Sequence, residues 1–187
     1  MEGWLYNRPG IKEVIAEYKK GGYTNVISVG MFIENRMNKH KCYSSAELAA
    51  GKLKKLGLIA NITTITAPYE DTHRTYNMGL ALRNYFQPNP DKSGNLNILT
   101  IGVHARKSRR LFQTALGESY TVGVISAKEN CYDRDRWWVS GTGIRLVTRN
   151  TTGYLYSLIF SAYINLKKLT GHYPLSSNHT ASMSHLL

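Results

Sequence analysis

Residues 97–112 read NILTIGVHARKSRRLF, an apolar run that passes directly into a basic one. The run over residues 98–103 is largely apolar on both sides of the pleat, which is typical of a parallel strand covered on both faces. Gly102 permits a sharp turn, and a helix over residues 104–116 is predicted to follow. His104 would then lie at the carboxyl edge of the sheet, where open α/β sheets bind ligands.

The same alternation of strand and helix patterns extends along the chain. Further strands are predicted at residues 25–30, 61–66 and 120–126, and helices at residues 11–20, 45–56, 74–85 and 153–168. Residues 141–148 fit either a short helix or an extended segment. Because strands that alternate with helices form βαβ units, we predict a Rossmann-like three-layer α/β/α fold with a mostly parallel sheet of about four to six strands.

The length of 187 residues favours a single domain, expected over residues 1–170, with a weakly ordered C-terminal tail over residues 171–187. The alternation begins with a helix at residues 11–20, whereas a parallel sheet of this type usually begins with a strand. We therefore expect the chain to be trimmed at its N-terminus, with only the end of a first strand left in residues 2–4.

The charge balance is strongly basic, with 24 Lys and Arg residues against 12 Asp and Glu residues and a net charge of +12. Such an excess attracts polyanions and says nothing about the fold. Candidate partners are phosphorylated small molecules, nucleic acid and an anionic membrane surface. The alternative is a solvated basic face without a dedicated partner.

The cysteine count and the hydropathy of the chain mainly exclude metal-binding, membrane-spanning and secreted classes of protein. Cys42 and Cys131 lie in no metal-binding spacing, so both a disulfide and two thiols stay open, and no metal site is predicted. No apolar stretch is long enough to span a bilayer, and the N-terminus lacks the pattern of a signal peptide. We expect the chain as given to be soluble.

The basic residues after the predicted strand are the main candidates for ligand binding. His104 is the candidate catalytic residue, as a general acid or base or as a donor to a phosphate oxygen, with a helix N-cap as the alternative. Arg106, Lys107 and Arg109 could clamp an anion or could be solvated. Their position favours binding most strongly for Arg106, in the first turn of the helix.

Several short motifs, taken in order, resemble the YdcF/SanA/ElyC-like family, domain of unknown function family 218, and in particular a bacterial branch with an EGW opening. The motifs are Glu2-Gly3-Trp4, Gly21-Gly22-Tyr23, Ser45-Ala46-Glu47-Leu48-Ala49-Ala50, Arg74-Thr75-Tyr76, His104-Ala105-Arg106-Lys107-Ser108-Arg109, Arg136-Trp137-Trp138 and Gly153-Tyr154-Leu155-Tyr156.

This resemblance implies a Rossmann-like fold, an association with the bacterial cell envelope, a membrane anchor removed with the missing N-terminus, and a pocket at the carboxyl edge of the sheet. It also implies a nucleotide or S-adenosylmethionine as the bound cofactor. The ligand positions carried over are Gly30, Glu47, Thr75, His104 and Arg106, to which we add Arg74, Gly102, Lys107 and Arg109. The chain departs from the family pattern at Lys107, Met78 and Asn150, where an arginine, an asparagine and a glutamate are frequent.

Two of these positions also have a purely local interpretation. Ser44 and Glu47 form a capping box that accounts for Glu47 without a ligand. Thr75 lies where a helix is predicted to begin, so its hydroxyl could be a cap.

Three hypotheses remain. The first is a protein that binds an anionic, phosphate-bearing or nucleotide-like small molecule at the strand ends. If the protein is an enzyme, phosphoryl or glycosyl-phosphate chemistry suits such a pocket. The second is a regulatory module that binds a nucleotide or S-adenosylmethionine without turnover. The third and least favoured is a nucleic-acid-binding domain, which would spread its charge over one broad face.

Overall fold

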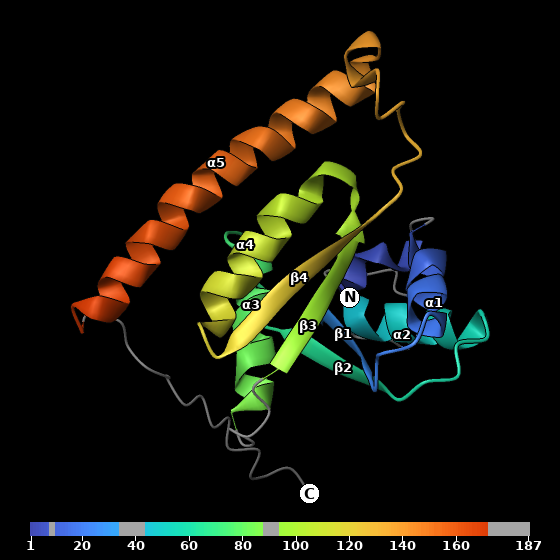
Figure 1. Ribbon diagram of the computed structural model, residues 1–187, viewed down its shortest axis with the longest axis horizontal. Helices are drawn as coiled ribbons and strands as arrows, with labels where there is room; N and C mark the ends of the chain where they lie inside the picture. The colour runs from blue at the N-terminus through green and yellow to red at the C-terminus, as the bar shows by residue number, and fades with distance from the viewer. Residues whose placement is uncertain (8–9, 34–43, 88–93, 172–187) are drawn as a thin grey trace, which may run out of the picture.

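The computed structural model describes residues 1–7, 10–33, 44–87 and 94–171. Its regular elements alternate along the chain (Figure 1). The helices are α1 (Ile11–Lys19), α2 (Ser45–Lys55), α3 (Arg74–Phe86), α4 (Ala105–Leu116) and α5 (Gly141–Leu169), and the strands are β1 (Val26–Met31), β2 (Ile62–Ala67), β3 (Gly94–Ile101) and β4 (Tyr120–Ala127). Three short 3-10 helices are also present, η1 (Gly3–Asn7), η2 (Gly102–His104) and η3 (Trp137–Val139).

The strands form two parallel pairs. Strand β1 pairs with β2 from Val26 opposite Ile62 to Met31 opposite Ala67, and β3 pairs with β4 from Gly94 opposite Tyr120 to Ile101 opposite Ala127. The α/β class and the parallel direction are therefore confirmed. The predicted single sheet of four to six strands is wrong for the described residues, which form two two-stranded sheets.

A very short segment links the two pairs. Glu2 forms a parallel bridge with Val29 of β1, and the Val29 N–H donates to the carbonyl of Met1 at 3.0 Å. On the other side, the Glu2 N–H donates to the carbonyl of Leu99 in β3 at 3.2 Å. Two residues are too few to form a ladder, since a typical strand has about five or six. For this reason the pairs are connected without merging into one sheet.

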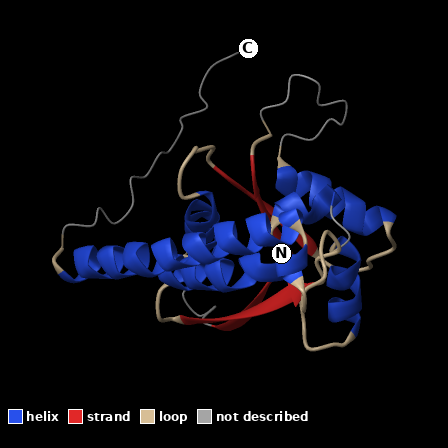
Figure 2. Ribbon diagram, turned by 90° about the horizontal axis from the view of Figure 1, so that it is seen from above, coloured by secondary structure: helices blue, strands red, loops and turns tan. Residues whose placement is uncertain are grey.

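Helices pack against the strands (Figure 2), and the apolar side chains between them form separate clusters. One cluster joins η1, α1 and α2 to the strands and consists of Leu5, Ile11, Val14, Val26, Leu53, Leu58, Leu99, Ile101 and Ala127. The other joins α3 and α4 to the strands and consists of Val29, Met31, Ala67, Met78, Leu82, Ile98, Phe112, Leu116 and Val122. A third cluster attaches α5 to α3 and α4 through Tyr76, Leu111, Ala115 and Ile164.

Helix α5 is continuous, which settles the open interpretation of residues 141–148 in favour of a helix. Its start is fixed by Ser140, whose side-chain oxygen accepts from the Gly143 N–H at 3.0 Å. None of the described helices is long and apolar enough to cross a membrane. Cys42 and residues 172–187 lie outside the described residues, so the choice between a disulfide and two thiols stays open and the expected tail stays a prediction.

Candidate functional site

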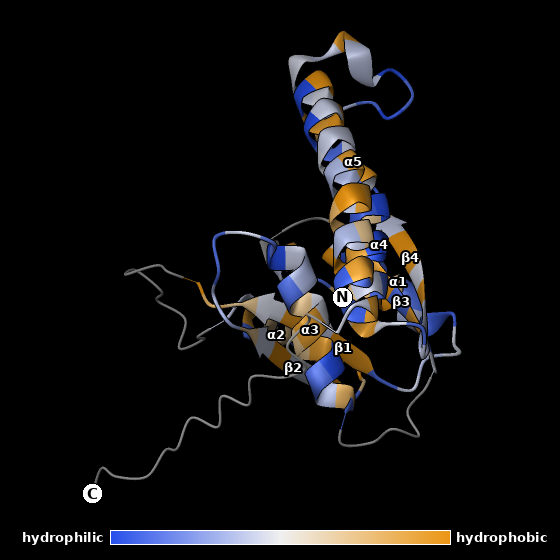
Figure 3. Cartoon of the chain, turned by 90° about the vertical axis from the view of Figure 1, so that its left-hand side faces the viewer, coloured by the Kyte–Doolittle hydropathy of each residue, from blue (hydrophilic) through white to orange (hydrophobic). Residues whose placement is uncertain are grey.

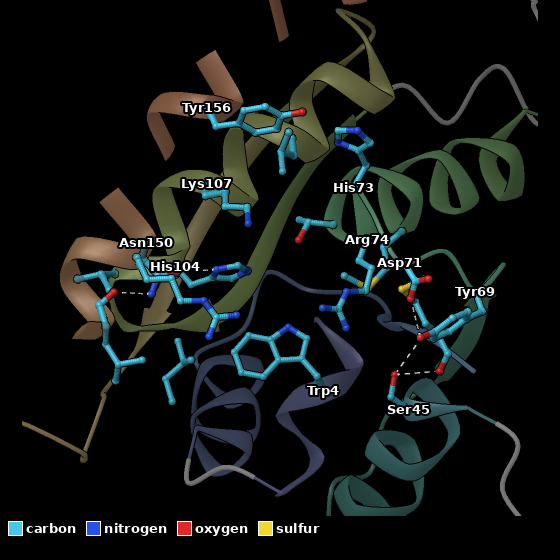
Figure 4. Close-up of a pocket in the computed structure, with 18 of the residues that line it drawn as sticks. Trp4, Ser45, Tyr69, Asp71, His73, Arg74, His104, Lys107, Asn150 and Tyr156 are labelled. Atoms are coloured by element: carbon cyan, nitrogen blue, oxygen red, sulfur yellow. Dashed lines mark hydrogen bonds between the residues drawn. The ribbon is translucent and has the colours of Figure 1, made fainter. Parts of the chain in front are cut away.

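A cavity of about 770 Å³ lies at the carboxyl ends of the strands (Figure 4). Strands β1 and β3 contribute their last residues, Met31 and Ile101, to its wall. The first turns of three helices also reach it, with Ser45 from α2, Arg74 and Thr75 from α3, and Lys107 from α4. Helix α5 closes one side with Leu146, Arg149, Asn150 and Tyr156. A cavity is therefore present at the edge where the sequence predicts a ligand site, and ligand binding there stays a prediction.

Two helix N-termini at this cavity lack a side-chain cap among the described residues. His73 precedes α3 and His104 precedes α4, and neither side chain makes a capping hydrogen bond. The first turns contain no acidic residue, and Arg74 and Lys107 lie there instead. The positive end of the helix dipole disfavours cations in the first turn and favours anions. This arrangement is therefore unfavourable by itself and would be relieved by a bound anion.

Among the described residues, three cationic side chains line the cavity from three different helices. Arg74, Lys107 and Arg149 come from α3, α4 and α5. Lys107 is half-buried, and its pKa is lowered by burial and by the positive charges of Arg149 and Arg74, against an opposing effect of Glu2. The lysine also lies against Gly153, where a Cβ would be 3.4 Å from its Cδ atom. In Figure 4, Lys107 and Arg74 point toward a common space.

The His104 ring is oriented by contacts at both nitrogens. Its Nδ1 lies 3.1 Å from the Oδ1 of Asn150. The Asn150 amide nitrogen donates to the carbonyl of Leu146 at 2.8 Å, which leaves Oδ1 as the acceptor for an Nδ1–H group. The Nε2 atom lies 3.8 Å from the Oε1 of Glu2. Trp4 packs edge-to-face on the ring, with 5.7 Å between centroids.

Behind His104, Glu2 is a fully buried carboxylate. It accepts hydrogen bonds from Thr100 and, at 3.1 Å, from the Ser108 hydroxyl, and both of these residues are buried too. Burial alone would raise the pKa of Glu2, but the contact with His104 and the two hydroxyl groups outweigh it and lower the pKa. Conversely, burial would lower the pKa of His104, but Glu2 and Asn150 outweigh it and raise the pKa. The buried carboxylate thus favours the protonated form of the imidazole, and the imidazole favours the ionised form of the carboxylate.

Aromatic rings form the wall of the cavity next to α3. His73 stacks on Phe160 with 4.4 Å between ring centroids and an interplanar angle of 16°. Tyr156 is nearly parallel to both, at 6.0 Å from His73 and 6.2 Å from Phe160. The backbone of His73 has a φ of 54°, a left-handed conformation that is uncommon for a residue other than glycine. A strained residue in this position is typical of a functional site.

Only some of the predicted ligand residues meet at this cavity. Arg74, Thr75, His104 and Lys107 line it. Arg106 and Gly102 instead line a second cavity of about 920 Å³, between α5 and the end of β4. His104 and Arg106, both predicted to bind the ligand, are therefore divided between two cavities, because residues two positions apart at the start of a helix face in different directions.

The other three predicted residues have structural partners elsewhere. Gly30 faces the start of α2, where a Cβ would meet Ser45 and Ala46. Glu47 completes the capping box with Ser44. The Nε of Arg109 donates to the carbonyl of Val122 in β4 at 2.9 Å.

Sequence reasoning missed several residues of the site. Arg149, Asn150 and Tyr156 come from α5, and their approach to α4 depends on the tertiary packing of that helix. For the buried network, Thr100 inside an apolar strand was an available signal, because a buried hydroxyl needs a partner. Nothing in the local sequence identifies Glu2 as that partner.

The cavity also contains acidic groups, so its charge is not uniform. Asp71 accepts from the Tyr69 hydroxyl at 3.0 Å, and Glu129 lines the same cavity. No group of three or more metal-ligating side chains occurs among the described residues. The arrangement can therefore bind a ligand that has both anionic and hydroxyl groups. Comparisons of this chain with protein-family models, with curated proteins and with solved structures found no match.

Proposed function

We propose that this protein binds an anionic, phosphate-bearing small molecule of the nucleotide type in the cavity at the strand ends. One observation carries the proposal. Two uncapped helix N-termini, with Arg74 and Lys107 in their first turns, face one cavity together with Arg149. A phosphate group would accept hydrogen bonds from the backbone N–H groups and compensate the three positive charges.

Two further features favour a nucleotide over inorganic phosphate. The parallel rings of His73 and Tyr156 present a surface on which a planar base can stack. The carboxylates of Asp71 and Glu129 are acceptors suited to sugar hydroxyl groups. A volume of about 770 Å³ also falls in the range of small-molecule sites.

For His104, the contacts favour a positioning role over proton transfer, and hence a binding module without turnover. A general base needs a nitrogen that can take a proton from the substrate. Here Nδ1 faces Asn150, and Nε2 faces the carboxylate of Glu2. These contacts orient the ring at the cavity wall, and Glu2 raises the pKa of His104 against the effect of burial.

The finer fold and the family are also part of the proposal. In a Rossmann-like arrangement, residues 1–2 would occupy the central strand position, between β1 on one side and β3 on the other. Cavities at the carboxyl ends of parallel strands are the usual ligand sites of that fold. Membership of domain of unknown function family 218 and its association with the cell envelope are proposed on the sequence motifs alone.

The test is a binding measurement with a matched control. We would titrate wild-type protein with ADP, a sugar nucleotide, S-adenosylmethionine and inorganic pyrophosphate by calorimetry. The double variant Arg74→Gln with Lys107→Gln should lose about 100-fold or more in affinity for the phosphate-bearing ligands, since two charge-assisted contacts are removed.

The control is Arg106→Gln, which removes the same charge one position from Lys107 but lines the second cavity. It should bind like the wild type. The double variant removes two charges and the control removes one, so a loss of binding free energy in the control of about half that of the double variant would show that binding depends on total charge. Absence of binding to all four compounds would refute the proposed site.

A further inference from the structure

Helix α5 carries hydrophobic residues along its length (Figure 3), and large apolar side chains are exposed on its outer face. Large apolar side chains are more than half exposed at Leu155 (56%), Ile159 (72%), Leu166 (60%) and Leu169 (85%). With the exposed Ala162, they recur at spacings of four, three, four and three residues, so they share one side of the helix. Soluble proteins rarely leave such a continuous apolar surface uncovered.

The opposite face of α5 is already occupied. Ser157, Ser161 and Ile164 are buried, and the Ser161 hydroxyl accepts from the Thr114 hydroxyl of α4 at 2.8 Å. Packing against the described part of the molecule thus explains the buried face of α5 and does not explain the apolar stripe on its outer face.

The charge and aromatic content of α5 indicate what could cover the stripe. The helix contains Arg145, Arg149, Lys167 and Lys168 and no Asp or Glu. Half-exposed Tyr156 and Tyr163 lie beside the stripe, and the Lys167 ammonium lies 4.8 Å from the ring centre of Tyr163. Tyrosine and lysine at the edge of an apolar helix face are typical of helices that lie at a membrane–water interface.

We propose that α5 lies on the surface of an anionic lipid bilayer, with this stripe in contact with the acyl boundary. The net charge of +12 would attract the protein to anionic headgroups, and the apolar side chains would then partition between them. A second copy of the chain is a less suitable occupant. Pairing of two copies would bring together two chains that each have a net charge of +12, and like charges repel.

The experiment measures cosedimentation with vesicles of phosphatidylglycerol and phosphatidylcholine, and with vesicles of phosphatidylcholine alone. Ile159→Lys with Leu166→Lys removes two apolar groups and increases the positive charge. If the stripe enters the bilayer, this double variant should partition at least about tenfold less onto the anionic vesicles. Purely electrostatic adsorption would instead become stronger.

A matched control is Ile59→Lys, since Ile59 is 94% exposed and follows α2, away from the stripe. It should bind at least as tightly as the wild type. Because a double substitution could alter folding, a second measurement uses Ala162→Trp, whose indole should be quenched by brominated lipid.

Three results would overturn the proposal. They are unaltered binding of the Ile159→Lys, Leu166→Lys variant, absence of wild-type binding to anionic vesicles, and a wild-type dimer that the double substitution dissociates. Light scattering would detect such a dimer, and its dissociation by the double substitution would show that the stripe is a contact between copies of the chain.

Discussion

At the scale of single residues, the buried carboxylate of Glu2 is the most demanding group in the protein. An isolated charge in an apolar interior costs many kcal/mol, so it is retained only where it is paired and hydrogen-bonded. Thr100, Ser108 and His104 provide that compensation. The same contacts orient the imidazole at the cavity wall, so the stability of the network and the geometry of the site depend on one another.

The Glu2–His104 pair should make stability depend on pH. The raised pKa of His104 gives a contribution that is complete below its ordinary value of 6.5 and is lost as the pH rises through the folded-state pKa. The lowered pKa of Glu2 gives a contribution that is complete above its ordinary value of 4.5 and is lost as the pH falls through the folded-state pKa. We expect Glu2→Gln to lower the free energy of unfolding by about 3 kcal/mol between these two values, and by less on either side.

Urea denaturation at a series of pH values would measure this difference. Glu47→Gln changes an acidic residue of the same type in the capping box of α2, away from His104, and serves as the control. Its effect should not change as His104 titrates. A Glu2→Gln effect that stays constant through the titration of His104 would contradict the pairing.

At the scale of secondary-structure elements, the contact between α3 and α4 requires a glycine. A Cβ at Gly79 would lie 2.6 Å from the Cβ of Ala115, whereas a Cβ at Gly51 in α2 would meet nothing within 4 Å. Alanine favours a helix interior by about 1 kcal/mol over glycine. We therefore expect Gly51→Ala to stabilise the protein by up to about 1 kcal/mol. Gly79→Ala should destabilise it by about 1–3 kcal/mol, because overpacking exceeds the gain in propensity.

Thermal and urea unfolding of the two variants would compare identical substitutions in two helices. Stabilisation by both substitutions would mean that α3 and α4 can move apart at Gly79 without a loss of stability. Destabilisation by both substitutions would mean that helix propensity does not determine the effect of Gly51→Ala in α2.

The elements were largely predictable, and the long-range contacts were not. The four strands are runs rich in β-branched residues, and the capping box of Ser44 and Glu47 is a local signal, so both follow from neighbouring residues. By contrast, Glu2 is 98 residues from Thr100 and 106 from Ser108. The sequence left residues 141–148 as either a helix or an extended segment, so the position of Arg149 relative to the cavity could not be predicted. Contacts of this kind depend on how elements pack, which periodicity does not encode.

At the scale of the whole molecule, the two strand pairs depend on residues 1–2 for their connection. The Val29 N–H donates to Met1, and the Glu2 N–H donates to Leu99, so this segment contributes hydrogen bonds to both pairs. The Glu2 side chain anchors the segment to β3 through Thr100 and to α4 through Ser108. Weakening that anchor should therefore loosen both pairs together.

Amide hydrogen exchange of Glu2→Gln tests this coupling. Exchange should become faster in β1, at Val29, and also in β3 and β4, because local opening of the linking segment exposes both pairs at once. The comparison is Ser44→Ala, which removes the cap of α2 at a cost of about 1 kcal/mol and should speed exchange only in the first turn of that helix. If Glu2→Gln changed exchange in β1 while β3 and β4 kept wild-type rates, the pairs would open independently and the segment would not couple them.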